Sequence, residues 1–182
     1  DADGALCFAT EDGQRSVHAD ATLLALGGGS WPQLGSDGAW TPLLQSRGVA
    51  LAPLQAANCG FDVPWTAWFI QRNAGTPLKS VVAHWTDLQG TLRHLQGECV
   101  VSEYGIEGSL VYALSADLRE TINRDGSATL WLDLVPGREQ DRLAADLARP
   151  RNGRSFGEHL RRQTGVDAVK ASLLFEVLGK DA

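Results

Sequence analysis

The 182-residue sequence predicts an α+β fold, in which a section of short strands is followed by a cluster of short helices. Three observations lead to this prediction. Residues 21–26 are almost wholly apolar, as in a strand that is buried on both faces of a parallel sheet. Residues 49–104 have the composition and turn spacing of short strands. Beyond residue 137, leucine and valine recur at helical spacing.

The chain opens with a predicted β-hairpin. Its two alternating stretches, residues 5–10 and 14–19, are separated by Glu11-Asp12-Gly13. The Asp-Gly pair favours a tight turn because glycine adopts the positive φ that such a turn requires. We therefore expect a hairpin that leads into the buried strand at 21–26.

The apolar run ends abruptly in a glycine-rich loop, Gly27-Gly28-Gly29-Ser30. A short helix is expected over residues 37–47, with Ser36 or Thr41 as its cap. Residues 49–51 then predict a further short strand.

The middle section is predicted to be rich in short strands, with one helix. Residues 78–85 and 91–96 are expected to pair across a turn at 87–90. Residues 109–120 predict a helix with one buried stripe, and residues 128–134 predict a returning strand. The stripe consists of Leu110, Val111, Leu114 and Leu118.

The last section predicts a small helical subdomain. Residues 138–148 and 166–178 place apolar side chains on one helical face. Between them, Ser155 and Glu158 have the spacing of a capping box, which satisfies the free N–H groups at a helix start. The order of elements therefore predicts three parts, residues 1–47, 48–136 and 137–182.

Composition excludes several classes of function. The net charge of −6 argues against nucleic-acid binding, which requires clustered Lys and Arg. No apolar run approaches the ~20 residues that cross a bilayer, so we expect no membrane partner. Three cysteines and four histidines lack metal-ligand spacing, so we expect no metal site. The chain contains no Met, and we expect a segment of a longer cytoplasmic protein with reduced thiols.

Three short segments are candidates for chemistry. The glycines at 27–29 follow a predicted strand, where they would let a ligand approach the backbone or would simply form a tight turn. Residues 35–38 would bind an anion at a helix start or act as an ordinary cap. Residues 102–109 would turn Tyr104 or Glu103 toward a substrate, or would form only a loop and a cap. No nucleophile stands in a recognisable motif, so the catalytic residues stay unknown.

Taken together, these segments resemble a known family. Residues 24–38 read Leu-Ala-Leu-Gly-Gly-Gly-Ser-Trp-Pro-Gln-Leu-Gly-Ser-Asp-Gly. They resemble the A-T-G-G-x-S-[YW]-P-x-x-G-[ST]-x-G signature of BaiN-like flavoproteins, NAD(P)/FAD-dependent oxidoreductases also described as aminoacetone-oxidase-like. Residues 75–81 are similar to the family's G-x-x-L-K-N-V strand. Residues 98–109 are similar to its G-x-x-L-F-T-H-x-G-[LI]-S-G-P segment, and the likeness covers residues 14–178.

Departures from the signature indicate a divergent branch of that family. Leu26 stands where the family usually has Thr, Glu107 where Ser is usual, and Ser109 where Pro is usual. Substrates known for other members are therefore not carried over to this chain.

The resemblance implies a FAD-binding domain that is split by an inserted β-barrel and a helical subdomain. Residues 1–47 would supply a β-hairpin and one strand, whereas the dinucleotide-binding loop and the C-terminal flavin-contacting segment would lie outside the chain. FAD would be the cofactor of the whole enzyme, which acts on a small molecule, and this fragment alone is expected to bind none. The implied cofactor contacts are Gly27, Gly28, Gly29 and Ser30, and the implied substrate-side loop contains Tyr104, Gly105 and Gly108.

Two other hypotheses stay open. The chain could be a non-enzymatic module that covers a substrate or binds a protein, and exposed apolar surface on residues 1–47 would then support a homo-oligomer. A hydrolase centred on Ser30 or Ser109 would require a histidine base beside one of those serines.

Overall fold

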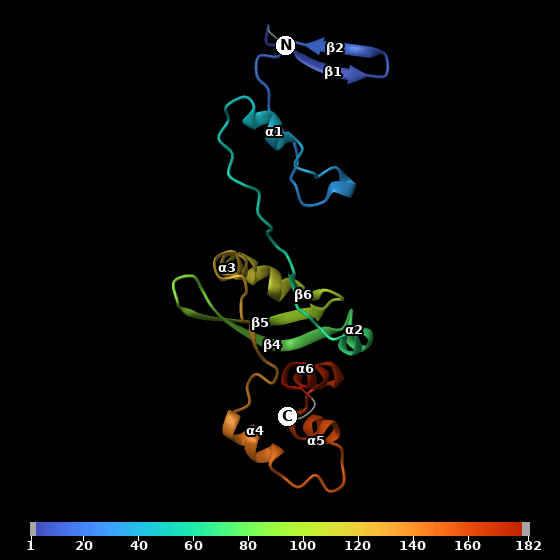
Figure 1. Cartoon of the computed structure of the whole chain (residues 1–182), viewed down its shortest axis with the longest axis vertical. Coiled ribbons are helices and arrows are strands. Elements are labelled where there is room, and N and C mark those ends of the chain that lie inside the picture. The colour runs from blue at the N-terminus through green and yellow to red at the C-terminus, as the bar shows by residue number, and fades with distance from the viewer. Residues whose placement is uncertain (1–2, 180–182) are drawn as a thin grey trace. The chain divides into compact units, whose positions relative to one another are not determined.

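The computed structural model describes residues 3–179 (Figure 1). The chain divides into two compact units, residues 1–55 and 56–182. The first contains a β-hairpin and short helical turns, and the second contains a larger sheet and the longer helices.

The first unit opens with the predicted β-hairpin. β1 (Leu6–Thr10) and β2 (Gly13–Val17) pair antiparallel, with Cys7 opposite Ser16. Gly13 has a φ of 113°, a value that side chains disfavour, so the turn prediction is confirmed.

Residues 21–26 do not form the buried strand that the sequence predicts. The backbone here has no regular structure, and 91% of Leu23 is exposed. Leu24 and Leu26 are also exposed. A strand is buried on both faces only where other elements cover it, and no strand among residues 3–55 pairs with this run. The strand predicted at 49–51 is likewise absent.

A short helix follows the glycine-rich segment. α1 (Trp40–Gln45) confirms the helix predicted within residues 37–47. Its predicted cap is wrong, because the N-cap residue is Ala39 and neither Ser36 nor Thr41 supplies a side-chain cap. Thr41 instead donates its hydroxyl to a backbone carbonyl one turn earlier.

The second unit is built on an antiparallel sheet with the strand order β3-β6-β5-β4-β7. The predicted pairing of the two long strands is confirmed by β4 and β5, which run together from Pro77↔Val100 to Thr86↔Leu92. Within the described residues, β3 and β7 lie at the two edges of the sheet. The strands are β3 (Phe61–Asp62), β4 (Pro77–Thr86), β5 (Leu92–Val101), β6 (Gly105–Glu107) and β7 (Trp131–Asp133).

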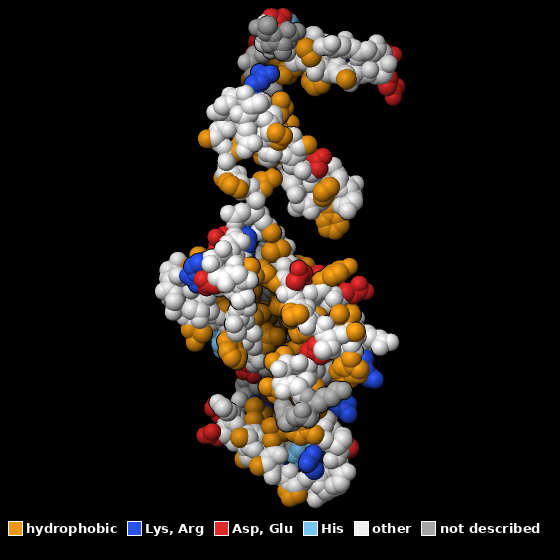
Figure 2. Space-filling view, viewed as in Figure 1, with side chains coloured by type: hydrophobic (Ala, Val, Ile, Leu, Met, Phe, Trp, Pro, Cys, Tyr) orange, Lys and Arg blue, Asp and Glu red, His pale blue; other side chains and the backbone are white. Residues whose placement is uncertain are grey.

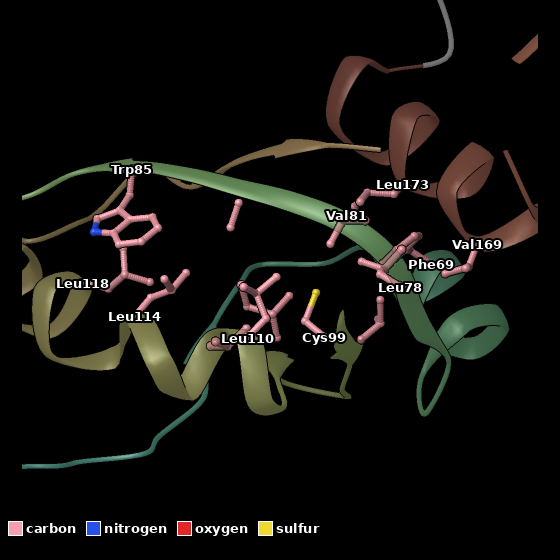
Figure 3. Close-up of a cluster of buried hydrophobic side chains, with 14 residues drawn as sticks. Phe69, Leu78, Val81, Trp85, Cys99, Leu110, Leu114, Leu118, Val169 and Leu173 are labelled. Carbon is pink, nitrogen blue, oxygen red and sulfur yellow. The ribbon is translucent and has the colours of Figure 1, made fainter. Parts of the chain in front are cut away.

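The core of this unit lies between the sheet and α3 (Ser109–Asp125) (Figure 3). The predicted stripe of α3 is confirmed, since all four of its members are buried against β4 and β5. Trp85 packs at one end of this cluster, where its indole N–H donates to Asp117 at 2.7 Å. At the other end, Phe69 of α2 (Ala67–Asn73) is fully buried.

A β-bulge interrupts β4 and sets which side chains enter the core. The register of β4 against β5 shifts between Leu78 and Val81, and Ser80 has a φ of 50°. In a regular strand two residues separated by three positions point to opposite faces. The extra residue of the bulge brings Leu78 and Val81 to the same buried cluster.

The third predicted part, the helical subdomain, contains α4 (Gln140–Leu147), α5 (Phe156–Thr164) and α6 (Ala168–Leu178). The capping prediction is confirmed at Ser155, whose side chain accepts the Glu158 N–H at 3.3 Å. No helix among residues 3–179 has the length and apolar character needed to cross a membrane.

α6 joins the helices to the sheet through a buried ammonium group. Lys170 Nζ donates to the carbonyl of Leu134 at 2.8 Å and to that of Ser80, at the β4 bulge, at 3.4 Å. Glu176 lies further along α6. Its carboxylate accepts the hydroxyl of Thr66, the N-cap residue of α2, at 2.8 Å. α6 therefore ties together three segments that are distant in sequence.

We expect Lys170→Met to lower the free energy of unfolding by about 2 kcal/mol, because it keeps the aliphatic stem but leaves the carbonyls of Ser80 and Leu134 without this buried donor. Urea denaturation of the chain measures the change. Lys79→Met is the matched control, since Lys79 is exposed on the same bulge. Equal stabilities for the two variants would contradict this role for Lys170.

Candidate functional site

The glycine-rich loop of the first unit is held by contacts to the chain that follows it. The Trp40 indole N–H donates to the carbonyl of Gly27 at 3.1 Å. The Gly38 N–H donates to the carbonyl of Gly28 at 3.0 Å. A single 3₁₀ turn, Pro32–Leu34, lies between the two ends of this loop. The loop therefore has a defined shape without a neighbouring strand.

The three glycines differ in backbone conformation and in what surrounds them. A Cβ on Gly29 would lie 2.7 Å from Leu54 Cδ1, and one on Gly28 would lie 3.1 Å from Ser36 Oγ. Gly27 has a φ of 76°, and a Cβ there would meet nothing within 4 Å. The positive φ of Gly27 favours glycine there, whereas the atoms nearest to Gly28 and Gly29 are the ends of flexible side chains.

The hydrolase hypothesis finds no geometric support. Within residues 3–179 no hydrogen bond joins Ser30 or Ser109 to a histidine. Cys99 is no substitute nucleophile, because burial raises the pKa of its thiol to about 11 and keeps it protonated. No cluster of His, Cys, Asp and Glu in the described part of the chain could hold a metal ion.

The predicted segment at residues 102–109 forms a tight connection between β5 and β6. The Ser102 N–H donates to the carbonyl of Gly105 at 2.8 Å, and the Gly105 N–H donates to Ser102 Oγ at 3.0 Å. The backbone of Tyr104 accepts the Val63 N–H at 2.9 Å, while 76% of the residue is exposed. A fixed backbone thus presents the Tyr104 ring to solvent.

Gly105 and Gly108 are needed by the fold itself. A Cβ on Gly105 would collide with the carbonyl oxygen of Phe61 and lie 2.6 Å from Val63 N, where β3 pairs with β6. Gly108 has a φ of 105° and precedes α3, and a Cβ there would lie 3.4 Å from Cys99 Cα. Sequence reasoning gave these glycines a place beside the substrate and missed their role in strand packing.

Sequence reasoning also missed an apolar cleft of about 1000 Å³ in the second unit. Both edge strands of the sheet line it, together with the second half of α3 and the end of α6. Figure 2 shows hydrophobic side chains gathered around a hollow in this unit. The apolar alternation of residues 128–134 predicted a strand, but nothing in it indicated that one side of the strand would stay uncovered.

The sites predicted from sequence fall in different units. Gly27, Gly28, Gly29 and Ser30 belong to the first unit, and the loop with Tyr104 belongs to the second. Each group is ordered by its own local hydrogen bonds.

Comparison with known proteins now defines the class of protein. The model of the family described as HI0933-like protein barrel and H2TH domain matches residues 55–179. The chain is also similar to a 3-dehydro-bile acid delta(4,6)-reductase of Clostridium scindens, with 30% identity over 132 residues that cover 72% of this chain and 31% of the relative. The aligned part thus spans about a third of the relative's length.

The chain belongs to the HI0933-like family of flavin-dependent oxidoreductases. This confirms the BaiN-like resemblance. The barrel and H2TH domain of that family corresponds to the second unit, with its antiparallel sheet and terminal helices.

We expect Gly105→Ala to destabilise the chain by about 1–3 kcal/mol, because the added methyl group has no space between β3 and β6. Gly157→Ala, within α5, is the matched control. A Cβ there would lie 3.5 Å from the Phe175 ring, which is an ordinary van der Waals contact. The control should be neutral or more stable, as alanine favours helix over glycine. A thermal melt in which both variants match the parent chain would show that Gly105 is not needed for strand packing.

Proposed function

We propose that this chain is part of a longer FAD-dependent oxidoreductase, in which the second unit is the inserted domain that covers the substrate. Membership of the HI0933-like family carries this proposal, because the matched region is the barrel and H2TH domain of that family. When bound in the whole protein, FAD would supply the redox chemistry, and the protein would supply binding and orientation.

A partial flavin site is compatible with the first unit. Gly27 has open space where a side chain would stand, and the exposed Trp31 and Leu34 lie nearby in sequence. These features suit the edge of a flat, apolar ring. A phosphate cradle requires a glycine turn that opens a substantial helix, and the helix described in residues 3–55 has only six residues. We therefore propose that segments beyond this chain hold the phosphates, and that residues 1–182 alone bind FAD poorly.

Tyr104 is the residue we place on the substrate side. Its backbone is fixed by Val63 and by the turn at Ser102, so little backbone entropy remains to be lost when the exposed ring contacts a ligand. The relative is named for its action on a 3-dehydro-bile acid. A substrate with an extended apolar ring system is accordingly the class that we propose to test first.

Exposed apolar side chains in the first unit are compatible with the alternative function, an interaction module. Leu23, Leu34 and Leu43 of the first unit are all more than half exposed. We propose that another protein segment covers these side chains. In the proposed enzyme, that segment is the remainder of the FAD-binding domain.

In the whole protein, we expect Tyr104→Ala to lower kcat/KM about tenfold, which corresponds to ~1.4 kcal/mol of lost transition-state binding. The visible spectrum of bound flavin and the melting temperature should stay unchanged, because the side chain is exposed. Trp68→Ala removes another exposed aromatic ring, on α2, and should leave kcat/KM unaltered. A 3-dehydro-bile acid is the first substrate for the assay, and equal effects of the two variants would contradict a substrate-side role for Tyr104.

A further inference from the structure

A second pocket, of about 700 Å³, lies between α2, α5 and α6, and we call it the helical pocket. α6 packs against both other helices, which lie beside it in Figure 1. The helical pocket shares no lining residue with the apolar cleft or with the loop that contains Tyr104. The lining residues that matter for its chemistry are Arg72 of α2, Glu158 and Arg161 of α5, and Ala171, Phe175 and Glu176 of α6.

Two arginines line the helical pocket without a carboxylate partner. The Arg72 guanidinium group lies over the Trp68 ring, 4.9 Å from the ring centroid. Arg161 donates its Nε–H to the carbonyl of Gly157 at 3.3 Å. Within residues 3–179 neither arginine forms an ion pair. The stacking and the hydrogen bond orient the two guanidinium groups, and their terminal N–H donors are available to a ligand.

The two carboxylates of the helical pocket already have partners. Glu158 Oε1 lies 3.6 Å from Arg154 Nε. The Glu176 carboxylate accepts the backbone N–H and the hydroxyl of Thr66. With Arg154 included, three guanidinium groups accompany two carboxylates. A ligand with a single negative charge therefore balances these groups, whereas a dianion would be repelled by the two carboxylates.

The apolar part of the lining comes from α6. Ala171 is buried, and Phe175 is half-buried with its ring edge-to-face against Phe156 at 5.8 Å between centroids. A bare inorganic anion would leave these apolar groups uncovered. The volume lies within the range of small-molecule pockets, so a body of two fused rings can enter it.

We propose that the helical pocket binds a small monocarboxylate that carries an apolar ring system. Its carboxylate bridges Arg72 and Arg161, and its rings cover Ala171 and Phe175. Arginine is suited to this role because its planar fork matches the two oxygens of a carboxylate. The site goes beyond the proposed oxidoreductase function, since none of its residues lies in the loop of Tyr104.

Three ligands with the same ring system test the proposal on the 182-residue chain. β-Naphthoate is the monoanion, β-naphthamide has a similar shape without the charge, and β-naphthyl phosphate is a dianion above about pH 7. Isothermal titration calorimetry measures their affinities. We expect a Kd below about 1 mM for β-naphthoate and at least about tenfold weaker binding for each of the other two ligands.

Variants of the chain locate the site. Arg72→Gln and Arg161→Gln should each weaken β-naphthoate binding about tenfold, because each removes one charge-assisted contact. Arg162→Gln is the matched control, since it removes the same charge from the next residue of α5, which is exposed and does not line the helical pocket. It should bind like the parent. Circular dichroism checks that all three variants are folded.

Four results would overturn the proposal. An absence of saturable β-naphthoate binding would exclude the site. Equal binding of β-naphthamide would show that the arginines do not recognise the carboxylate, and tighter binding of β-naphthyl phosphate would assign the site to dianions. Equal weakening by Arg162→Gln and Arg72→Gln would show attraction by overall charge alone. None of these results depends on flavin, so the proposed oxidoreductase function stands or fails separately.

Discussion

The second unit depends on the β-bulge of β4 and on the buried lysine that binds it. The bulge brings Leu78 to the same core as Val81, and it exposes the carbonyl of Ser80 to the Lys170 ammonium group. Because a buried ammonium group without an acceptor costs free energy, sheet and helices are coupled at this point. The same helix also lines the apolar cleft, through Leu173 and Leu174.

The two units differ in how far their apolar residues are buried. The second unit has a core of fully buried residues between α3 and the sheet, including Val101 and Val111. The first unit leaves Leu23 and Trp31 largely exposed, although its glycine-rich loop is well hydrogen-bonded. A loop that is ordered while its apolar neighbours are uncovered suits a shared site, in which other segments complete the surface around a cofactor.

Local signals in the sequence predicted most elements correctly, and non-local ones were missed. The Asp-Gly hairpin, the stripe of α3 and the Ser155 cap each depend on residues within one turn or one strand pair. The strand at 21–26 was wrong because burial depends on neighbours that composition cannot specify. The bulge, the packing role of Gly105 and the cleft depend on register between distant strands, and alternation alone does not reveal register.

The central claim is that this chain contributes one part of a flavin site and does not form the site alone. FAD binding to the purified 182-residue chain tests it most directly, by ultrafiltration with about 10 µM FAD and the folded state checked by circular dichroism. We expect the flavin to pass through the ultrafiltration membrane while the folded chain is retained. Retention of FAD in a one-to-one ratio with the chain would contradict the account, because the residues present would then bind the cofactor without help.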